Sequence, residues 1–327
     1  MTATAPTANP SSTIDKSNSL SARMATRLVN SILAIKPVYN VAKTRARNMM
    51  IQRAESIGVY WHQEVEALRS RGGEAEFSPQ WEADLAAMTN PNVQYPEYFL
   101  QSFHAYEEGN MGWLPAMEVE VAAYAVHARI WPGADAEGDA RLRRSYHEAL
   151  KPQLAHEPKD VLDLACSVGM STAALQEAFP QANVTGLDLS PYFLAIAKYR
   201  AQAQAQKPIH WVHAAAEATG LPSASFDLVS AHLLFHELPQ DAAIAVFQEA
   251  RRLLRPGGYL AIMDMNPQSE IYAKMPPYIL TLLKSTEPCL DEYFALDIEQ
   301  AIEDAGFERP TMTCNTPRHR TVVARAR

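Results

Sequence analysis

Val161-Leu-Asp-Leu-Ala-Cys-Ser-Val-Gly-Met170 joins an apolar run to a segment with helical spacing, and this junction decides the fold. Residues 161–165 fit a short buried strand, and residues 171–178 fit a helix. The connecting backbone can turn sharply and approach a ligand closely, because three of its residues are small: Ala165, Ser167 and Gly169. The N–H groups that begin the helix then point toward that ligand.

An acidic residue follows this junction at the spacing expected for a ribose-binding carboxylate. Asp188 ends a second apolar run, residues 184–187, about 20 residues after Gly169, a spacing at which an acid commonly meets ribose hydroxyls. The junction has neither the GxGxxG spacing of dinucleotide folds nor the GK[ST] of nucleoside triphosphate sites. The pattern therefore indicates a nucleoside-bearing ligand of another kind.

Strands and helices alternate from residue 159 onward, which predicts an α/β fold with a doubly wound, mostly parallel sheet. The seven expected strands are residues 161–165, 184–187, 209–213, 226–231, 259–265, 309–314 and 321–325. The expected helices are residues 171–178, 191–205, 241–254 and 296–305. The short connection 315–320 makes the last two strands an antiparallel hairpin. A helical N-terminal region precedes this sheet.

Four motifs stand in a fixed order along this part of the chain: VLDLACSVGMST, VTGLDLSPYFLAIA, EATGLPSASFDLVSAHLLFHELP and RRLLRPGGYLAIMD. On these motifs, residues 159–327 resemble the class I S-adenosylmethionine (SAM)-dependent methyltransferases. Within that class they look most like the small-molecule branch with the ubiquinone and menaquinone C-methyltransferases. YPEYFLQSFHAYEEGNMGW, STEPCLDEYF and PRHRT are also similar to a little-studied cyanobacterial and plastid group, which implies no substrate.

The resemblance implies a SAM site. Asp163 would face the amino group of the cofactor, Asp188 would hold its ribose, and Leu189 would lie against its adenine. The full set of expected cofactor residues is Asp163, Ala165, Cys166, Ser167, Gly169, Asp188, Leu189, Ala215, Ala216 and Glu217. Ala165 and Ser167 replace usual glycines, and Ala215 stands where an adenine-binding Asp is common. These departures indicate either a tuned site or an altered one.

His236 and Glu237 follow the fourth strand at its carboxyl end, where doubly wound sheets bind ligands. We expect His236 to be a base or substrate hydrogen-bonder, or else a structural polar residue. Glu237 would orient His236 or begin a helix favourably. His232, earlier in the strand, is expected to be an interior histidine. No cysteine or histidine spacing predicts a metal site.

Residues 58–150 are expected to form a helical cap over the substrate. Its candidate residues are His104, Tyr106, Glu107 and Trp113, with Tyr106 as a catalytic candidate and a buried aromatic stripe as the alternative. Arg318 and Arg320 lie in the last turn, which topology places on the same rim as the cofactor. They either pair with nearby acids or bind a carboxylate or phosphate of the substrate.

Charge is unevenly distributed. Residues 1–57 carry a net charge of +6 within a chain of net charge −8, so the remainder carries −14. Residues 1–18 are expected to be a disordered tail, and residues 19–57 basic amphipathic helices interrupted at Pro37. These helices would contact the acidic body or an anionic membrane, or form part of a transit peptide. The acidic body argues against a nucleic acid partner.

The composition fits a globular protein of about two domains, 47% hydrophobic and with three scattered cysteines. Residues 151–327 would form the SAM-binding domain. The favoured function is SAM-dependent methyl transfer to a small, aromatic or lipophilic metabolite. The alternatives are O- or N-methylation of a polar, acid-bearing metabolite, and a catalytically silent SAM-binding scaffold or regulator. A cytoplasmic location is expected, with membrane association or organelle import as alternatives.

Overall fold

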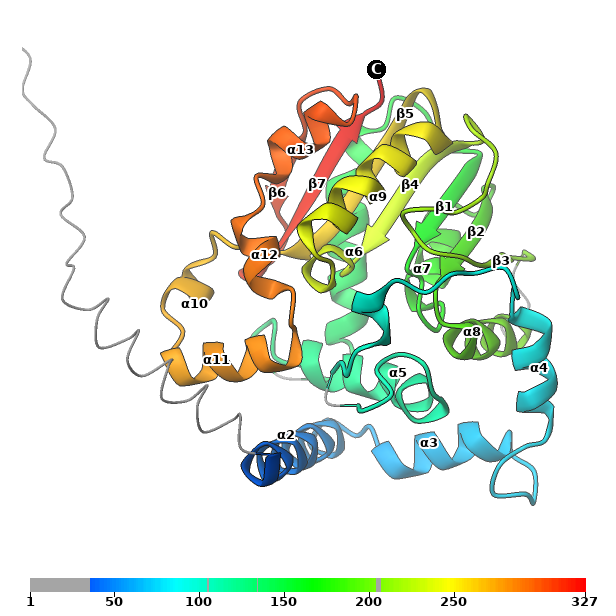
Figure 1. Cartoon of the computed structure of the whole chain (residues 1–327), viewed down its shortest axis with the longest axis vertical. Coiled ribbons are helices and arrows are strands. Elements are labelled where there is room, and N and C mark those ends of the chain that lie inside the picture. The colour runs from blue at the N-terminus through cyan, green and yellow to red at the C-terminus, as the bar shows by residue number, and fades with distance from the viewer. Residues whose placement is uncertain (1–35, 105, 134, 204–206) are drawn as a thin grey trace, which may run out of the picture.

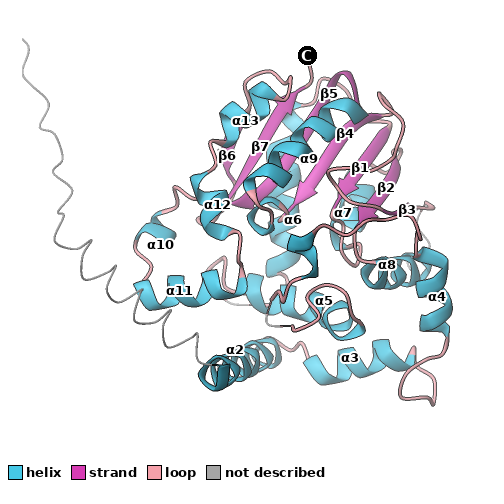
Figure 2. Ribbon diagram, viewed as in Figure 1, coloured by secondary structure: helices cyan, strands magenta, loops and turns pink. Residues whose placement is uncertain are grey.

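The computed structural model describes residues 36–327 except 105, 134 and 204–206. The expected disordered tail and the helix expected before Pro37 fall outside these residues. A seven-stranded sheet forms the centre, with helices on both faces (Figures 1 and 2).

The sheet confirms the predicted α/β fold class. Its strands, in the spatial order β3-β2-β1-β4-β5-β7-β6, are β1 (Asp160–Leu164), β2 (Asn183–Asp188), β3 (His210–His213), β4 (Phe226–His232), β5 (Leu254–Met265), β6 (Thr311–Cys314) and β7 (His319–Arg325). The first five strands pair in parallel, whereas β7 runs antiparallel to both β5 and β6. The carboxyl ends of β1 to β5 therefore form one rim, and the turn before β7 joins it.

The helices of the N-terminal region are α2 (Lys36–Ser56), α3 (Trp61–Ser70), α4 (Gln80–Met88), η1 (Glu97–Leu100), α5 (Trp113–His127), α6 (Gly138–Leu150) and η2 (Lys151–Gln153). Those of the sheet domain are α7 (Met170–Ala178), α8 (Pro191–Ala203), η3 (Phe235–Glu237), α9 (Gln240–Leu253), α10 (Glu270–Ala273), α11 (Pro277–Thr286), α12 (Leu290–Ala295) and α13 (Ile298–Asp304).

Two boundaries differ from the sequence prediction for clear reasons. The strand expected from residue 259 begins at Leu254, because Arg255-Pro-Gly-Gly258 forms an irregular start of β5 where its register with β4 shifts. The helix expected from residue 296 begins at Ile298, because the Asp297 side chain accepts a hydrogen bond from the Gln300 N–H and caps it.

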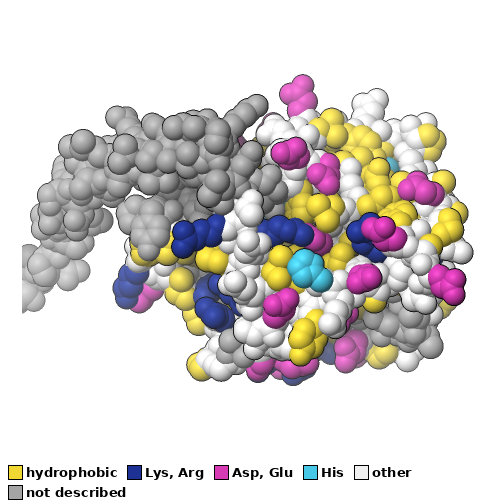
Figure 3. Space-filling model, turned by 90° about the horizontal axis from the view of Figure 1, so that it is seen from below, with side chains coloured by type: hydrophobic (Ala, Val, Ile, Leu, Met, Phe, Trp, Pro, Cys, Tyr) yellow, Lys and Arg dark blue, Asp and Glu magenta, His cyan; other side chains and the backbone are white. Residues whose placement is uncertain are grey.

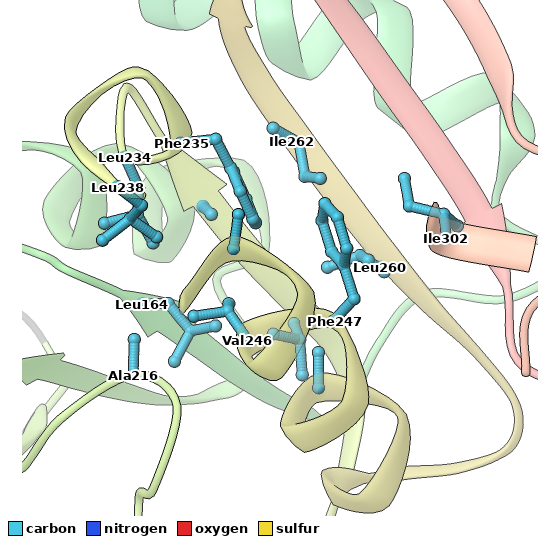
Figure 4. Packing of buried hydrophobic residues seen from close by; sticks show 14 of the residues in the cluster. Leu164, Ala216, Leu234, Phe235, Leu238, Val246, Phe247, Leu260, Ile262 and Ile302 are labelled. Atoms are coloured by element: carbon cyan, nitrogen blue, oxygen red, sulfur yellow. The ribbon is translucent and has the colours of Figure 1, made fainter. Parts of the chain in front are cut away.

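The core lies on both faces of the sheet. One cluster packs α9 and α13 against the sheet, with Phe235 and Phe247 stacked 4.7 Å apart between ring centroids (Figure 4). A second cluster packs α6 and α7 against the opposite face through Leu142, Tyr146 and Leu175. Burial of this apolar surface fixes the strands whose ends carry the site.

The N-terminal helices α2, α3 and α5 lie across the rim of the sheet (Figure 1). Within the described residues, α2 is helical from Lys36 onward and includes Pro37, which was expected to interrupt the helical pattern. Ala54 of α2 is buried with Trp61 and Val121, so the C-terminal part of this helix packs on the body. Among the helices that the structure describes, none combines the length and apolarity needed to cross a membrane.

Candidate active site

The loop between β1 and α7 has an unusual backbone. Ala165, Ser167 and Gly169 have φ values of 54°, 51° and 83°, all left-handed. The first two conformations each cost about 1–2 kcal/mol in a residue other than glycine. Trp211 of β3 packs beneath this loop, since a Cβ on Gly169 would lie 2.9 Å from its ring. The loop thus holds the shape of a ligand cradle despite its substituted glycines.

Asp163 is fully buried at the end of β1. Its Oδ2 accepts hydrogen bonds from the hydroxyls of Ser171 (2.6 Å) and Thr172 (2.7 Å). Its Oδ1 has no partner among the described residues. Burial raises the pKa of this carboxyl to about 6, against the effect of the two hydroxyls. A buried oxygen with free capacity fits a ligand that brings a positively charged donor, such as the SAM ammonium group.

Asp188 ends β2 and is also buried, and burial raises its pKa to about 6. Its two oxygens accept the backbone N–H groups of Ser167 (2.7 Å) and Ser190 (2.8 Å). Leu189, the next residue, is buried and its carbonyl lies 3.1 Å from Nε2 of His213. Asp188 therefore links the β1 loop to the start of α8.

The other expected cofactor residues differ in what they offer. Cys166 is buried, and burial raises the pKa of its thiol. Ala215 and Ala216 are buried and bring no polar side chain. Glu217 accepts a 2.7 Å hydrogen bond from the Tyr98 hydroxyl. Ala215, which the resemblance aligns with an adenine-binding Asp, thus offers no polar side chain.

Residues 89–112, the roof segment, cross the rim from β3 to the ends of β4 and β5. Near its start, the Asn90 N–H donates to Nδ1 of His213 (2.8 Å). Near its end, the Asn110 carbonyl accepts the Ser190 hydroxyl (2.6 Å). Between them, Nε2 of His104 lies 3.0 Å from Oε1 of Glu287. The roof segment therefore extends from the β2–β3 side of the rim to the β4–β5 side.

His236 and Asp264 form a buried ion pair at the ends of β4 and β5, with Nδ1 and Oδ1 2.7 Å apart. Burial opposes the charged imidazole, but Asp264, Glu287 and Glu237 outweigh it and raise the pKa of His236 to about 10. An imidazolium cannot accept a proton at neutral pH. The expected base role of His236 is therefore not supported, whereas a hydrogen-bonding role stays a prediction.

Glu237 follows His236 and faces the roof segment. Its Oε1 lies 3.7 Å from Nε2 of His104, and its side chain is 25% exposed. Burial raises the pKa of Glu237 to about 7, while the two histidines oppose the shift. His104 thus meets two carboxylates, Glu237 and Glu287, which raise its pKa although burial opposes this.

The remaining cap candidates lie in different surroundings. The Tyr106 hydroxyl donates to the buried carboxylate of Glu118 (2.7 Å), which also pairs with Arg47. Burial and Glu118 raise the pKa of Tyr106. Trp113 packs between Phe77, Trp81 and Tyr192, as the packing alternative expects, and Glu107 is exposed. The structure therefore brings His104, but not Trp113, to the β4–β5 side.

The turn before β7 lies on the cofactor rim, as topology requires: His319 pairs with Met265, and the Arg318 carbonyl accepts the Asn266 N–H (2.8 Å). Arg320 is buried over the Tyr293 ring. No described carboxylate forms an ion pair with Arg318 or Arg320. Nearby, Lys284 of α11 pairs with Asp291 of α12.

Sequence reasoning missed four residues that shape this region: Arg47, Glu118, Asp264 and Glu287. Asp264 and Glu287 carried a signal, because both stand in quoted motifs, RRLLRPGGYLAIMD and STEPCLDEYF. Glu118 and Arg47 lie in helices whose pairing no local pattern indicates.

Comparison with known proteins places this arrangement in a family. The sequence profile of a family described as a methyltransferase domain matches residues 161–258. A methyltransferase of Synechocystis sp., named without a substrate, is 31% identical over 163 residues, covering 50% of this chain and 73% of that protein. The chain belongs to the class I SAM-dependent methyltransferases, a class whose cofactor is SAM.

Other relatives carry names that give a substrate. Trans-aconitate 2-methyltransferase of Azoarcus sp. is 40% identical over 118 residues, covering 35% of this chain and 44% of that protein. Demethylmenaquinone methyltransferase of Thermus thermophilus is 34% identical over 130 residues, covering 39% of this chain and 56% of that protein. The chain thus spans about half the length of these two relatives.

Solved structures agree on the fold. Phosphoethanolamine N-methyltransferase 2 of Haemonchus contortus, in complex with SAM, superposes with a TM-score of 0.51 at 14% identity, covering 73% of this chain and 61% of that one. An O-methyltransferase fold from Nostoc punctiforme gives 0.50 at 17% identity, covering 82% and 73%.

Proposed function

We propose that this chain transfers a methyl group from SAM to a small, aromatic or lipophilic metabolite that lies between the roof segment and the ends of β4 and β5. The observation that carries the proposal is Oδ1 of Asp163, a buried carboxylate oxygen without a described partner beside a ligand-shaped loop. A cofactor with a cationic donor group would complete its hydrogen bonding.

In this proposal the chain mainly binds and aligns. Asp163 would hold the SAM ammonium group, Asp188 the ribose, and Leu189 the adenine. SAM supplies an electrophilic methyl group on its sulfonium. Displacement at that methyl is in line, so the protein must hold the acceptor opposite the sulfonium and exclude water. The roof segment, fastened on both sides of the crevice, would do both.

The side chains of the roof segment support an aromatic or lipophilic substrate. Tyr95, Tyr98, Phe99 and Phe103 all stand on it, and Tyr95 and Phe99 are stacked 6.2 Å apart. Such side chains suit a flat apolar group. The demethylmenaquinone relatives, whose names specify a lipophilic ring compound, support the same class.

A second candidate is O- or N-methylation of an acid-bearing metabolite. Arg318 and Arg129 are close enough to Arg53 of α2 for their charges, together with burial, to lower its pKa. None of the three forms an ion pair with a described carboxylate. Relatives named as trans-aconitate and malonyl-[acyl-carrier protein] methyltransferases favour such a substrate. Arg318→Ala and Arg320→Ala would then each raise the substrate KM, because each lost charged contact removes about 1.5–3 kcal/mol of substrate-binding free energy.

The deciding experiment begins with the cofactor. Calorimetry with SAM, followed by mass spectrometry of metabolites released from the purified protein before and after SAM addition, would give both the affinity and the methylated product. A mass increase of one methyl group in a released compound would support the proposal. SAM binding without any methylated product from candidate acceptors would instead favour the silent scaffold, and no SAM binding would refute both.

Membrane contact through residues 19–57 stays a separate proposal. The visible face around α2 and α3 carries basic and acidic side chains together (Figure 3). Sedimentation of the full chain with phosphatidylserine vesicles at low and high salt tests it, because electrostatic attachment weakens with salt. A variant that begins at Gly58 and sediments equally would show that the arm is not the anchor.

A further inference from the structure

His104, Glu237 and Glu287 come together from three separate segments of the chain. His104 belongs to the roof segment, Glu237 ends η3, and Glu287 follows α11. One ligand atom from each lies within 4.8 Å of the other two. Nε2 of His104 is 3.0 Å from Oε1 of Glu287 and 3.7 Å from Oε1 of Glu237.

The two separations from His104 suit ligands of one metal ion, and the two glutamates lie within 4.8 Å of each other. With bonds of about 2.1 Å in a tetrahedral site, neighbouring ligand atoms lie about 3.4 Å apart. The two measured distances lie on either side of that value. The histidine also contributes Nε2, a nitrogen that commonly binds metals.

An independent observation comes from Glu287. The residue is 8% exposed, and its Oε2 has no partner among the described residues. A buried carboxylate oxygen with free capacity is costly unless a donor or cation completes it. The oxygen belongs to the carboxylate whose Oε1 contacts His104, so this unused capacity lies beside the cluster.

We propose that His104, Glu237 and Glu287 bind one divalent first-row transition-metal ion, of the class of Mn²⁺ or Zn²⁺. Two carboxylates balance the charge of the ion, and one imidazole with two carboxylates suits such borderline cations. Three protein ligands leave a further position for water or a substrate oxygen. No local pattern indicates this site, because its ligands are far apart along the chain.

Metal binding at this cluster does not depend on the proposed function, whereas the role of the bound ion rests on it. In a methyltransferase, the ion would hold an oxygen atom of the substrate at the β4–β5 side. It would also tie the roof segment to the rim, since one of its ligands is His104. The substrate class would then be a metabolite with an oxygen atom available for metal binding.

The test uses the full chain, treated with chelator and dialysed, and titrated with Co²⁺, Mn²⁺ and Zn²⁺ by calorimetry, with visible absorption of the Co²⁺ form. We expect one site of micromolar affinity or tighter. Glu287→Gln and His104→Ala should each weaken binding at least tenfold and change the Co²⁺ spectrum. Glu97→Gln, an exposed glutamate on the same roof segment, is the matched control and should bind as the wild type does.

Circular dichroism and SAM calorimetry accompany each variant. Folded Glu287→Gln that binds metal as tightly as the wild type would overturn the proposal, as would a wild type that binds none of the three ions. In that case the cluster is an ion pair of protonated His104 with two glutamates. SAM binding without metal binding would refute this site alone, and metal binding without SAM binding would refute the proposed function alone.

Discussion

The Ser190 hydroxyl donates a 2.6 Å hydrogen bond to the Asn110 carbonyl, which fastens the roof segment to the chain directly after Asp188. The same hydroxyl accepts the N–H of Phe193, 3.4 Å away, in the first turn of α8. Because the Ser190 N–H donates to Asp188, one residue links the proposed ribose-binding carboxylate to the roof segment.

Ser190→Ala should loosen the roof segment, because the Asn110 carbonyl loses its donor. We expect faster amide hydrogen exchange in residues 106–112 and a loss of about 1 kcal/mol in the free energy of unfolding. Ser269→Ala is the control, since Ser269 also caps a helix and donates to a distant carbonyl, that of Pro317. Equal exchange of residues 106–112 in both variants would contradict the coupling.

Asp188→Ala should weaken SAM binding by about 1–3 kcal/mol, through the loss of charge-assisted hydrogen bonds to the ribose. Calorimetry measures the change directly. Asp304→Ala, at an exposed helix end away from the rim, should bind SAM as the wild type does. Unchanged affinity of Asp188→Ala would remove this residue from the cofactor site.

Ala165→Gly should stabilise the protein. Relief of a left-handed backbone in alanine contributes about 1–2 kcal/mol, and the greater freedom of glycine in the unfolded chain offsets about 0.4–1 kcal/mol of this. Chemical denaturation should therefore show a net gain of up to about 1.6 kcal/mol in the free energy of unfolding. Ala173→Gly, inside α7, should instead lose about 1 kcal/mol. A lower free energy of unfolding in both variants would mean that Ala165 adopts its left-handed backbone conformation without strain.

Arg47→Ala should destabilise the docking of α2, because it leaves the buried carboxylate of Glu118 without its cation. The thermal midpoint should fall, and proteolysis within α2 should become faster. Arg45→Ala, an exposed arginine on the same helix, provides the control and should leave both unchanged. Equal midpoints in the two variants would show that the Arg47–Glu118 pair does not hold α2.

The buried carboxylates of Asp163 and Asp188 predict that pH affects the stability of the free protein and its affinity for SAM in opposite directions. Burial raises the pKa of Asp163 and Asp188 to about 6, so the folded state binds their protons more tightly than the unfolded state does. Their contribution to stability is therefore present below pH 4 and lost as the pH rises through 6. SAM, a cation, should bind more weakly as the pH falls through 6.

Thermal unfolding with and without SAM between pH 5 and 8 checks this pair of effects. The shift in midpoint caused by SAM should shrink on acidification, and Asp163→Asn should flatten the pH dependence of the free protein. If SAM raised the thermal midpoint more at pH 5 than at pH 8, this would contradict the prediction that ionised carboxylates bind the cofactor.

The sequence was sufficient to predict the sheet and the proposed cofactor-binding half of the site. The strands, their mostly parallel pairing and the proposed cofactor loop follow from local signals, because Asp163, Gly169 and Asp188 lie at fixed positions relative to their own strands. The terminal hairpin follows from a connection too short to cross the sheet. These features depend on neighbours in sequence, so patterns reveal them.

The other half depends on contacts between distant segments. His104 and Glu287 are far apart along the chain, and nothing in either local sequence indicates that their side chains meet. The environment of His236 was also hidden, because Asp264, which sets its protonation, lies on the neighbouring strand. Residue types identified the candidates, but three-dimensional packing decided their chemistry.

The indole of Trp211 beneath Gly169 gives the cofactor loop a built-in optical reporter. Its ring also packs against Gly186, where an added Cβ would lie 2.5 Å from it, so the ring is confined between β2 and the loop. Tryptophan emission responds to changes in local polarity and packing. Movement of the loop on ligand binding should therefore change the Trp211 contribution to the fluorescence of the native protein, which stopped-flow measurements can follow without an attached dye.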